Sequence, residues 1–240
     1  MKFDIPFFLQ TFFTALSGVP VTLLMTAGAL LIAVPVALFV AITRVNGVPV
    51  LKQLDALYVS FVRGTPVIVQ IFMIYSILPK LLKEFVEARG LEINVYDINP
   101  IWYAILIFGF NIATHFAEIF RSALLSVPKG QKEAAYAVGF SAIQTYVKFI
   151  IPQAFVIASP SFCTASMNLL KNTSLAFMIS VMDITGKAKM EAGIGYRYLE
   201  AYLDIFLVYI IICLLYEKGY RLLTAKAGKY QAKTMEGLRA

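Results

Sequence analysis

Three charged side chains interrupt segments of the chain that are otherwise apolar: Arg63, Glu118 and Lys171. An ionised group is costly in hydrocarbon, so such residues normally face a protein interior or a water-filled cavity and are functional by default. The Lys171 ammonium could bind the carboxylate of a small solute, and the Glu118 carboxylate could bind an ammonium group. This chemistry suits a zwitterion and argues against a membrane scaffold without a transport role.

Each of these charges also has a structural alternative. Arg63 could cap a neighbouring helix or pair with a carboxylate. Glu118 could pair with Arg121, which lies three residues further along the same helix face. Lys171 could form a structural bridge with Glu118. The sequence leaves these alternatives open.

Polar residues near the charges extend the candidate site. Asn168 and Ser174 flank Lys171 in a polar stretch that we expect to interrupt a membrane helix. A broken helix near the bilayer midplane leaves free helix-end groups, which suit a zwitterion. Thr65 follows Arg63-Gly64 and is a better candidate than Arg63 for facing the solute. His115 is the single histidine, and a lone histidine is more often a packing residue than a ligand.

The segment 129–152 is polar and helix-compatible, and it lies between strongly apolar segments. Small residues at positions 134, 135, 137 and 139 would let a partner approach the helix backbone closely. Glu133 is expected near the helix start, where a carboxylate suits the positive end of the helix dipole. The segment therefore predicts a docking helix at about 128–143, unless this helix packs on its own protein.

Composition places these residues in a membrane protein. Hydrophobic residues make up 60% of the 240-residue chain, and charged residues make up 15%, against about 25% in soluble proteins. Residues 18–43 and 149–170 carry no charge, and each segment is long enough to cross a bilayer as a helix. The net charge of +7 indicates positive cytoplasmic loops rather than nucleic-acid binding.

We expect an all-α polytopic membrane protein with about five transmembrane helices. The expected spans are 18–43, 56–80, 100–125, 148–181 with an interruption at 168–174, and 198–222. An interfacial helix at 1–17 would precede a single transmembrane domain at 18–225, and a basic cytoplasmic tail would occupy 226–240. The distribution of Lys and Arg favours an external amino terminus and a cytoplasmic carboxyl terminus. The first apolar run lacks a signal-peptide cleavage pattern.

Several kinds of site are not predicted. Gly186-Lys187 is followed by Ala188, and Val181 stands where a P-loop would need its first glycine. There is no spaced Cys/His cluster for a metal, and Cys163 and Cys213 are expected to be packing residues. No serine or cysteine has a clear base partner. We therefore expect no catalytic residue, metal or cofactor in this chain.

Four ordered motifs between about residues 15 and 225 resemble one family. Glu133-Ala134-Ala135, Gly139 and Phe149-Ile-Ile-Pro152 resemble the EAA loop of membrane permease subunits of ABC importers. Three further stretches resemble the polar amino-acid branch of that family: Arg63-Gly-Thr65-Pro66, Ala117-Glu118-Ile-Phe-Arg121 and Asn168-Leu-Leu-Lys171-Asn-Thr-Ser174-Leu175. Ile112-Ala-Thr-His115 departs from the family pattern, which leaves the substrate preference open.

The resemblance implies a five-span permease subunit in a bacterial plasma membrane that imports polar amino acids, with cystine and related sulphur amino acids as the closest match. The implied partners are a second permease subunit, identical or different, an ATPase dimer that binds ATP and Mg²⁺, and an extracytoplasmic amino-acid-binding protein. Glu133, Ala134, Ala135 and Gly139 would couple the subunit to the ATPase. The alternative is an ion-coupled secondary transporter, which would need no docking helix and more often shows inverted repeats.

Overall fold

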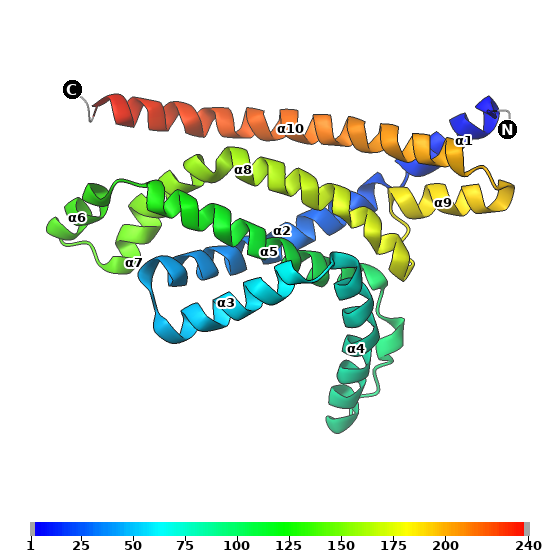
Figure 1. Cartoon of the computed structure of the whole chain (residues 1–240), viewed down its shortest axis with the longest axis horizontal. Helices are drawn as coiled ribbons and strands as arrows, with labels where there is room; N and C mark the ends of the chain where they lie inside the picture. Colours follow the sequence, from blue (N-terminus) through cyan, green and yellow to red (C-terminus); the bar gives the residue numbers. More distant parts are fainter. Residues whose placement is uncertain (1–2, 238–240) are drawn as a thin grey trace.

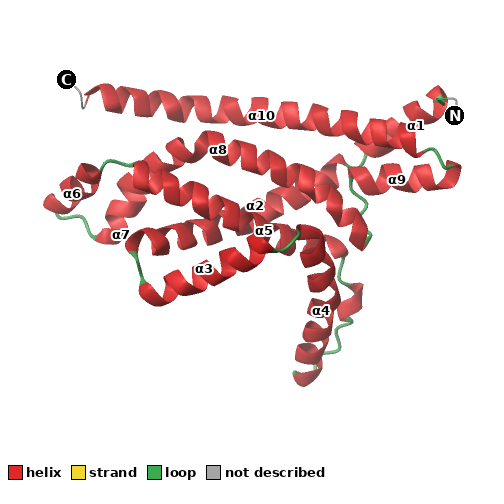
Figure 2. Cartoon of the chain, viewed as in Figure 1, coloured by secondary structure: helices red, strands yellow, loops and turns green. Residues whose placement is uncertain are grey.

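The computed structural model describes the backbone of residues 3–237 and the side chains of residues 3–225. Within these residues the chain is helical and contains no strand (Figure 2). Its elements are α1 (Ile5–Leu16), α2 (Val19–Asn46), α3 (Pro49–Gly64), α4 (Val67–Ala88), η1 (Val95–Asp97), α5 (Pro100–Ser126), α6 (Lys129–Ala137), α7 (Ala142–Thr145), the π-helical turn η2 (Tyr146–Ile150), α8 (Ile151–Asn172), the 3₁₀ helix η3 (Thr173–Ile179), α9 (Ile184–Gly195) and α10 (Tyr198–Gly237).

Helices long and apolar enough to cross a membrane confirm the predicted fold class. Four stretches of the described chain qualify: Ile5–Asn46, Pro100–Ser126, Ala142–Ile179 and Tyr198–Ala225. The bent pair of α3 and α4 makes a fifth. In Figure 1, α6 and α7 lie at one end of the bundle, and α9 and the amino terminus lie at the other.

The centre of the bundle is the contact between α2 and α5, which small residues make close. Ala29, Ala33, Ala37 and Ala41 recur every four residues along one face of α2, and each has no exposed surface. Small side chains let membrane helices approach closely and pack through van der Waals contact. At Gly109 of α5, an added Cβ would come within 3.0 Å of the Ile32 side chain. These helices therefore form a rigid base for the elements beside them.

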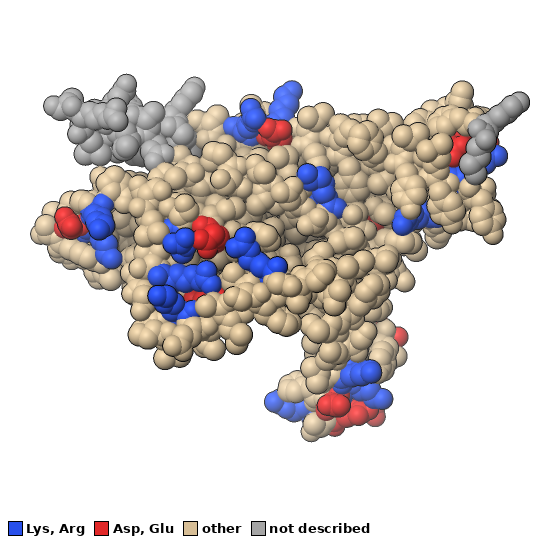
Figure 3. Space-filling model, viewed as in Figure 1, with Lys and Arg blue, Asp and Glu red and all other residues tan. Residues whose placement is uncertain are grey.

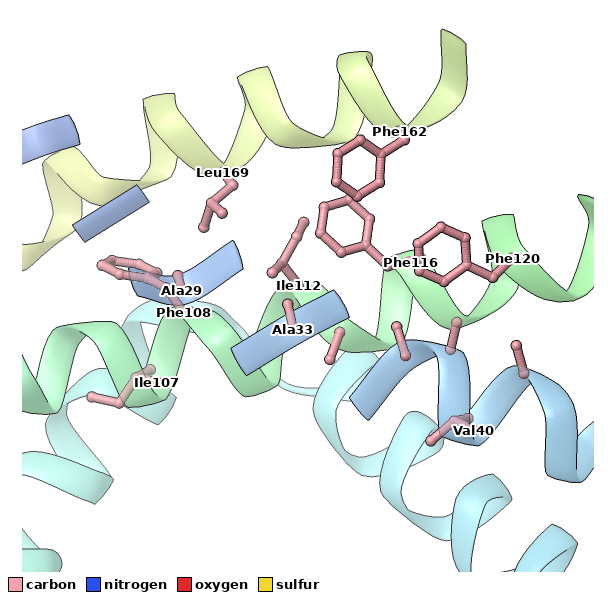
Figure 4. Packing of buried hydrophobic residues seen from close by; sticks show 14 of the residues in the cluster. Ala29, Ala33, Val40, Ile107, Phe108, Ile112, Phe116, Phe120, Phe162 and Leu169 are labelled. Carbon is pink, nitrogen blue, oxygen red and sulfur yellow. The ribbon is translucent and has the colours of Figure 1, made fainter. Parts of the chain in front are cut away.

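Aromatic rings join α5 to α8. The rings of Phe116 and Phe162 stack with their centroids 4.6 Å apart, and those of Phe120 and Phe162 with centroids 6.0 Å apart. Figure 4 shows these three side chains between the two helices, above the α2 alanines. Stacked rings add packing energy beyond their buried area. This contact fixes how α8 lies against α5.

The second predicted span was wrong in one respect, because it is not one continuous helix. α3 begins at Pro49 and ends at Gly64, and α4 leaves it at an angle of 108°. Thr65 is extended, with φ −118° and ψ 140°, because a residue before proline avoids the helical region. Pro66 follows and lacks the N–H that would continue the helix. Consequently α4 projects away from the bundle in Figure 1.

The structure also corrects the predicted interruption at 168–174. α8 stays α-helical to Asn172 and then passes directly into η3. The change is thus from α to 3₁₀ geometry, and the chain turns only at Ser180, which has φ +64°. The polar segment at 183–200 contains a helix, α9, which the sequence analysis did not predict.

The predicted amino-terminal helix exists as α1, and Asp4 caps it by accepting a hydrogen bond from the Phe7 N–H at 3.0 Å. It packs against α9 and α10, around buried alanines that include Ala15, Ala188 and Ala201. Its position at the membrane interface stays a prediction. At the other end of the chain, α10 extends to Gly237, so the predicted tail at 226–240 begins as helix.

Candidate functional site

A cavity of about 830 Å³ opens between α3, α5 and α8. One wall is a polar row on α5 made of Asn111, His115, Glu118 and Ser122, whose spacing of three or four residues keeps them on one helix face. The opposite wall is a row on α8 that contains Ser161, Asn168, Lys171 and Asn172, and α3 contributes Arg63. At 1.5 Å per residue, each row is roughly 16 Å long. The cavity is thus a polar strip within apolar helices.

Glu118 is paired with arginines. Arg121 donates to Glu118 Oε1 from Nε at 3.0 Å and from Nη2 at 2.5 Å. Arg44 Nη1 lies 3.5 Å from Glu118 Oε2, and Arg44 Nη2 donates to the Asp55 carbonyl at 3.0 Å. The structural alternative for Glu118 is therefore present, and the carboxylate already has cationic partners.

Lys171 and Arg63 are exposed and line the cavity. Among the side chains of residues 3–225, the ion pairs are Arg44–Glu118, Lys83–Glu87, Arg121–Glu118, Arg197–Asp4 and Arg221–Glu217. The suggested bridge between Lys171 and Glu118 is not among them. Both cations are therefore available to a ligand in the cavity.

The predicted polar neighbours of Lys171 are divided between two cavities. Asn168 lines the first cavity together with Lys171. Ser174 and Lys171 line a second cavity of about 780 Å³ between η3, α9 and α10. Lys171 is thus the residue that the two cavities share.

Thr65 lies at the α3–α4 bend and is not part of either lining. Its hydroxyl donates to the Phe61 carbonyl at 3.0 Å and accepts from Gln70 Nε2 at 2.8 Å. The first contact lies within the last turn of α3, and the second crosses the bend to Gln70 of α4. The Thr65 hydroxyl is therefore engaged in hydrogen bonds at the α3–α4 bend.

The sequence analysis missed the residue that organises this bend, Gln70. Gln70 is 5% exposed, and its Nε2 donates to the carbonyls of Val62 at 2.8 Å and Thr65 at 3.1 Å. Its Oε1 accepts from Asn111 Nδ2 at 3.0 Å. It satisfies carbonyls that the break in the helix leaves free. The available sequence signal was a glutamine four residues after Pro66 in an otherwise apolar run.

The predicted docking residues lie on and just beyond α6, but they do not share one surface. Glu133 and Ala134 are exposed, whereas Ala135 is 5% exposed and packs inward. Glu133 is the fifth residue of α6 and not near its start, because the helix begins at Lys129. Gly139 has φ +85° and follows the helix end, where its N–H donates to the Tyr136 carbonyl at 3.0 Å. Glycine suits this position because of its backbone freedom.

The segment after α6 folds back against the bundle. The rings of Phe140 and Phe149 meet edge to face with centroids 5.0 Å apart. Tyr146 donates from its hydroxyl to Asn46 Oδ1 at 3.0 Å, which ties η2 to the end of α2. α6 is thus held at one end of the bundle with part of its surface free.

Comparison with known proteins identifies this arrangement. Residues 33–229 match the family described as "binding-protein-dependent transport system inner membrane component". The chain is 38% identical over 213 residues to the probable amino-acid permease protein YxeN of Bacillus subtilis (strain 168), covering 89% of this chain and 91% of that protein. It is 34% identical over 221 residues to the L-cystine transport system permease protein TcyL of the same organism, covering 92% and 90%.

Solved structures agree with the family match. A crystal structure of an amino acid ABC transporter with histidines aligns with a TM-score of 0.74 and 26% identity, covering 94% of this chain and all of that one. The MetNI methionine ABC transporter in an inward-facing conformation aligns with a TM-score of 0.67 at 16% identity, covering 94% and 99%, and shares the fold.

The chain belongs to the inner membrane component family of binding-protein-dependent transport systems. It is a permease subunit of the ABC importer type, a transport component rather than an enzyme, and a multi-pass protein of the bacterial plasma membrane. The suspected family is thereby confirmed, and the ion-coupled secondary transporter is not supported.

Proposed function

We propose that this subunit imports amino acids and that the cavity between α3, α5 and α8 forms its part of the translocation path. The names of its relatives support this substrate class, because they include a probable amino-acid permease and an L-cystine permease. The observation that carries the proposal is the polar strip itself. Arg63 and Lys171 face the cavity without an ion-pair partner among the described side chains, and unpaired charges within membrane segments are functional by default.

In this proposal Arg63, Asn168 and Lys171 contact the substrate, and Ser174 lies on an adjoining part of the path. Glu118 holds Arg121 and Arg44 in position and does not bind the substrate ammonium group. Thr65 shapes the α3–α4 bend. This assignment departs from the sequence-based expectation for Glu118 and Thr65, because their polar atoms already have partners.

The driving energy enters through partner subunits. A separate ATPase dimer binds ATP and Mg²⁺ and docks on α6 through Glu133 and Ala134, while Ala135 and Gly139 maintain the shape of that helix end. A second permease subunit, identical or different, completes the path, and an extracytoplasmic amino-acid-binding protein delivers the substrate. The α6 end is cytoplasmic, and the amino terminus is external. Closure of the ATPases favours one of two conformations through differential binding.

The transport test uses proteoliposomes that contain the permease, its ATPase and its binding protein, with labelled amino acids including cystine. Uptake should require internal ATP and the binding protein. ATP-independent uptake driven by a proton or sodium gradient would contradict the proposal.

The docking test changes one exposed methyl group. Ala134→Leu adds bulk to the free surface of α6 and should reduce co-purification of the ATPase about tenfold, the effect of losing roughly 1.4 kcal/mol of binding. The permease itself should still accumulate in the membrane. Ala88→Leu is the matched control, because Ala88 is an exposed alanine at the end of α4. Equal ATPase recovery in both variants would argue against α6 as the docking site.

A further inference from the structure

The cavity between α3, α5 and α8 contains more positive than negative charge. Its ionisable lining residues are Arg63, His115, Glu118 and Lys171. Glu118 is the single carboxylate among the residues that line this cavity. Since Arg121 and Arg44 both approach this carboxylate, its negative charge is already balanced by two guanidinium groups.

Charged residues beside the cavity do not cancel its excess of positive charge. A further carboxylate belongs to Asp55, whose backbone carbonyl accepts a hydrogen bond from Arg44. Asp55 is 7% exposed, and its carboxylate accepts a hydrogen bond from the Thr43 hydroxyl. Even when Asp55 is counted with Glu118, the four cations Arg44, Arg63, Arg121 and Lys171 leave two positive charges uncompensated. Figure 3 shows Lys and Arg side chains around a smaller acidic area on the face formed by α3, α5 and α8.

The remaining polar wall is neutral. Asn111, Asn168, Asn172 and Ser161 present amide and hydroxyl groups to the cavity. These groups can accept hydrogen bonds from an ammonium group through their oxygens. A ligand carboxylate would instead find guanidinium and ammonium donors, which make stronger, charge-assisted bonds. The cavity is therefore equipped for more than one carboxylate and for a single ammonium group held by neutral acceptors.

We propose that this cavity selects amino acids that carry a second carboxylate group, with Arg63 and Lys171 as the residues that bind the two carboxylates. This inference rests on the proposed function and adds the chemical class of the substrate. It concerns the membrane subunit itself and not the choice made by the binding protein.

The experiment measures equilibrium binding of labelled amino acids to the permease–ATPase complex in nanodiscs, with the binding protein omitted. Two matched pairs isolate the second carboxylate: glutamate against glutamine, and aspartate against asparagine. We expect the dicarboxylate of at least one pair to bind about tenfold more tightly or better, as one charge-assisted bond would provide. Equal binding within every pair, a preference for lysine or arginine, or no binding of any probe would overturn the inference.

Variants assign the preference to residues. One of the variants Arg63→Gln and Lys171→Gln should remove most of the dicarboxylate preference with little change for the monocarboxylate partner, because it removes the cation that binds the side-chain carboxylate. The other variant should weaken binding of both members of each pair, because both carry the α-carboxylate. Glu118→Gln should retain dicarboxylate binding, because its carboxylate holds arginines. Loss of all amino-acid binding in a folded Glu118→Gln complex, checked by size-exclusion chromatography and ATPase activity, would contradict this assignment. Lys52→Gln is the control, since Lys52 is an exposed lysine of α3 outside the cavity lining.

The two proposals can fail separately. ATP-dependent uptake of amino acids together with no dicarboxylate preference in nanodiscs would leave the importer intact and remove the inference about substrate class. Absence of ATP-dependent uptake for every amino acid would remove both.

Discussion

Arg44 of α2 and Glu118 of α5 meet with Nη1 and Oε2 3.5 Å apart. The same guanidinium donates to the Asp55 carbonyl of α3 at 3.0 Å, so one side chain links three helices on one side of the cavity. The Arg44 side chain is 17% exposed, and partial shielding from water strengthens such contacts. Arg44 is therefore a positioning residue for the cavity wall.

Replacing Arg44 tests this link. Arg44→Gln removes a charged donor from Glu118 and from the Asp55 carbonyl, and hydrogen bonds to charged groups contribute about 1.5–3 kcal/mol each. Because Glu118 is 39% exposed, solvent screening reduces the expected loss of folding free energy to about 1 kcal/mol. We expect a lower thermal unfolding midpoint for the purified protein in detergent. Arg221→Gln is the control, because Arg221 is 78% exposed in its pair with Glu217; an equal shift in both variants would show that Arg44 has no special role.

Replacing Gln70 is expected to reduce stability more than replacing Arg44. Gln70→Leu removes the amide that donates to the Val62 and Thr65 carbonyls. Gln70 itself is only 5% exposed. An unsatisfied buried polar group costs about 1–3 kcal/mol, so the unfolding midpoint should fall by several degrees. Gln53→Leu alters an exposed glutamine of α3 and should change the midpoint little. A stable Gln70→Leu protein would show that the α3–α4 bend holds without this amide.

Substitutions of Gly139 test whether backbone strain at the end of α6 affects coupling to the ATPase. Its φ of +85° costs a non-glycine residue about 1–2 kcal/mol, and no atom lies within 4 Å of an added Cβ. Gly139→Val should therefore distort the end of α6 and lower the amount of substrate transported per ATP hydrolysed in proteoliposomes. Gly139→Asn should retain most of this ratio, because asparagine tolerates the left-handed region.

A second glycine provides the control for this effect. Gly90 follows α4 with φ +67° and also has no atom within 4 Å of an added Cβ. Gly90→Val should suffer similar strain at a helix outside the proposed docking site, and the transport ratio should stay unchanged. If Gly90→Val lowers the ratio as much as Gly139→Val, the effect is general destabilisation and not coupling.

Asp183 should make stability depend on pH. It is buried and lies between the last two candidate spans. Burial raises the pKa of its carboxyl to about 6. Hydrogen bonds donated by the Gly186 N–H and the Tyr209 hydroxyl oppose this shift only in part. Because this pKa is higher than that of the same carboxyl in the unfolded chain, protonation of Asp183 stabilises the folded protein. Its contribution to the free energy of unfolding is complete below about pH 4 and is lost as the pH rises through about 6. Between pH 5 and 7.5 the loss is about 1 kcal/mol.

The measurement compares unfolding midpoints of the wild type and Asp183→Asn at several pH values. Asparagine can still cap α9 but does not titrate. The midpoint of Asp183→Asn relative to the wild type should therefore increase from pH 5 to pH 7.5. A constant difference across this range would show that Asp183 has an ordinary pKa in the folded protein.

Much of the fold could be predicted because its signals are local. Hydrocarbon requires about 20 consecutive apolar residues for each spanning helix, so the segments that became α2, α5, α8 and α10 were visible as uncharged or weakly charged runs. The motif at 129–152 predicted a helix between two spans, and α6 is present there. The order of the four motifs also indicated the family, which the comparisons confirm.

The sequence by itself thus determined the membrane class, the family and the set of polar residues available to a site. Only the tertiary structure decided which of those residues meet. Glu118 is paired with Arg44 because the alanine face of α2 packs closely on α5, and Thr65 is engaged by Gln70 because Pro66 turns the chain through 108°. Such partnerships depend on helix packing and bend angles, which local sequence patterns do not encode. They leave Lys171 and Arg63 as the cations that face the cavity.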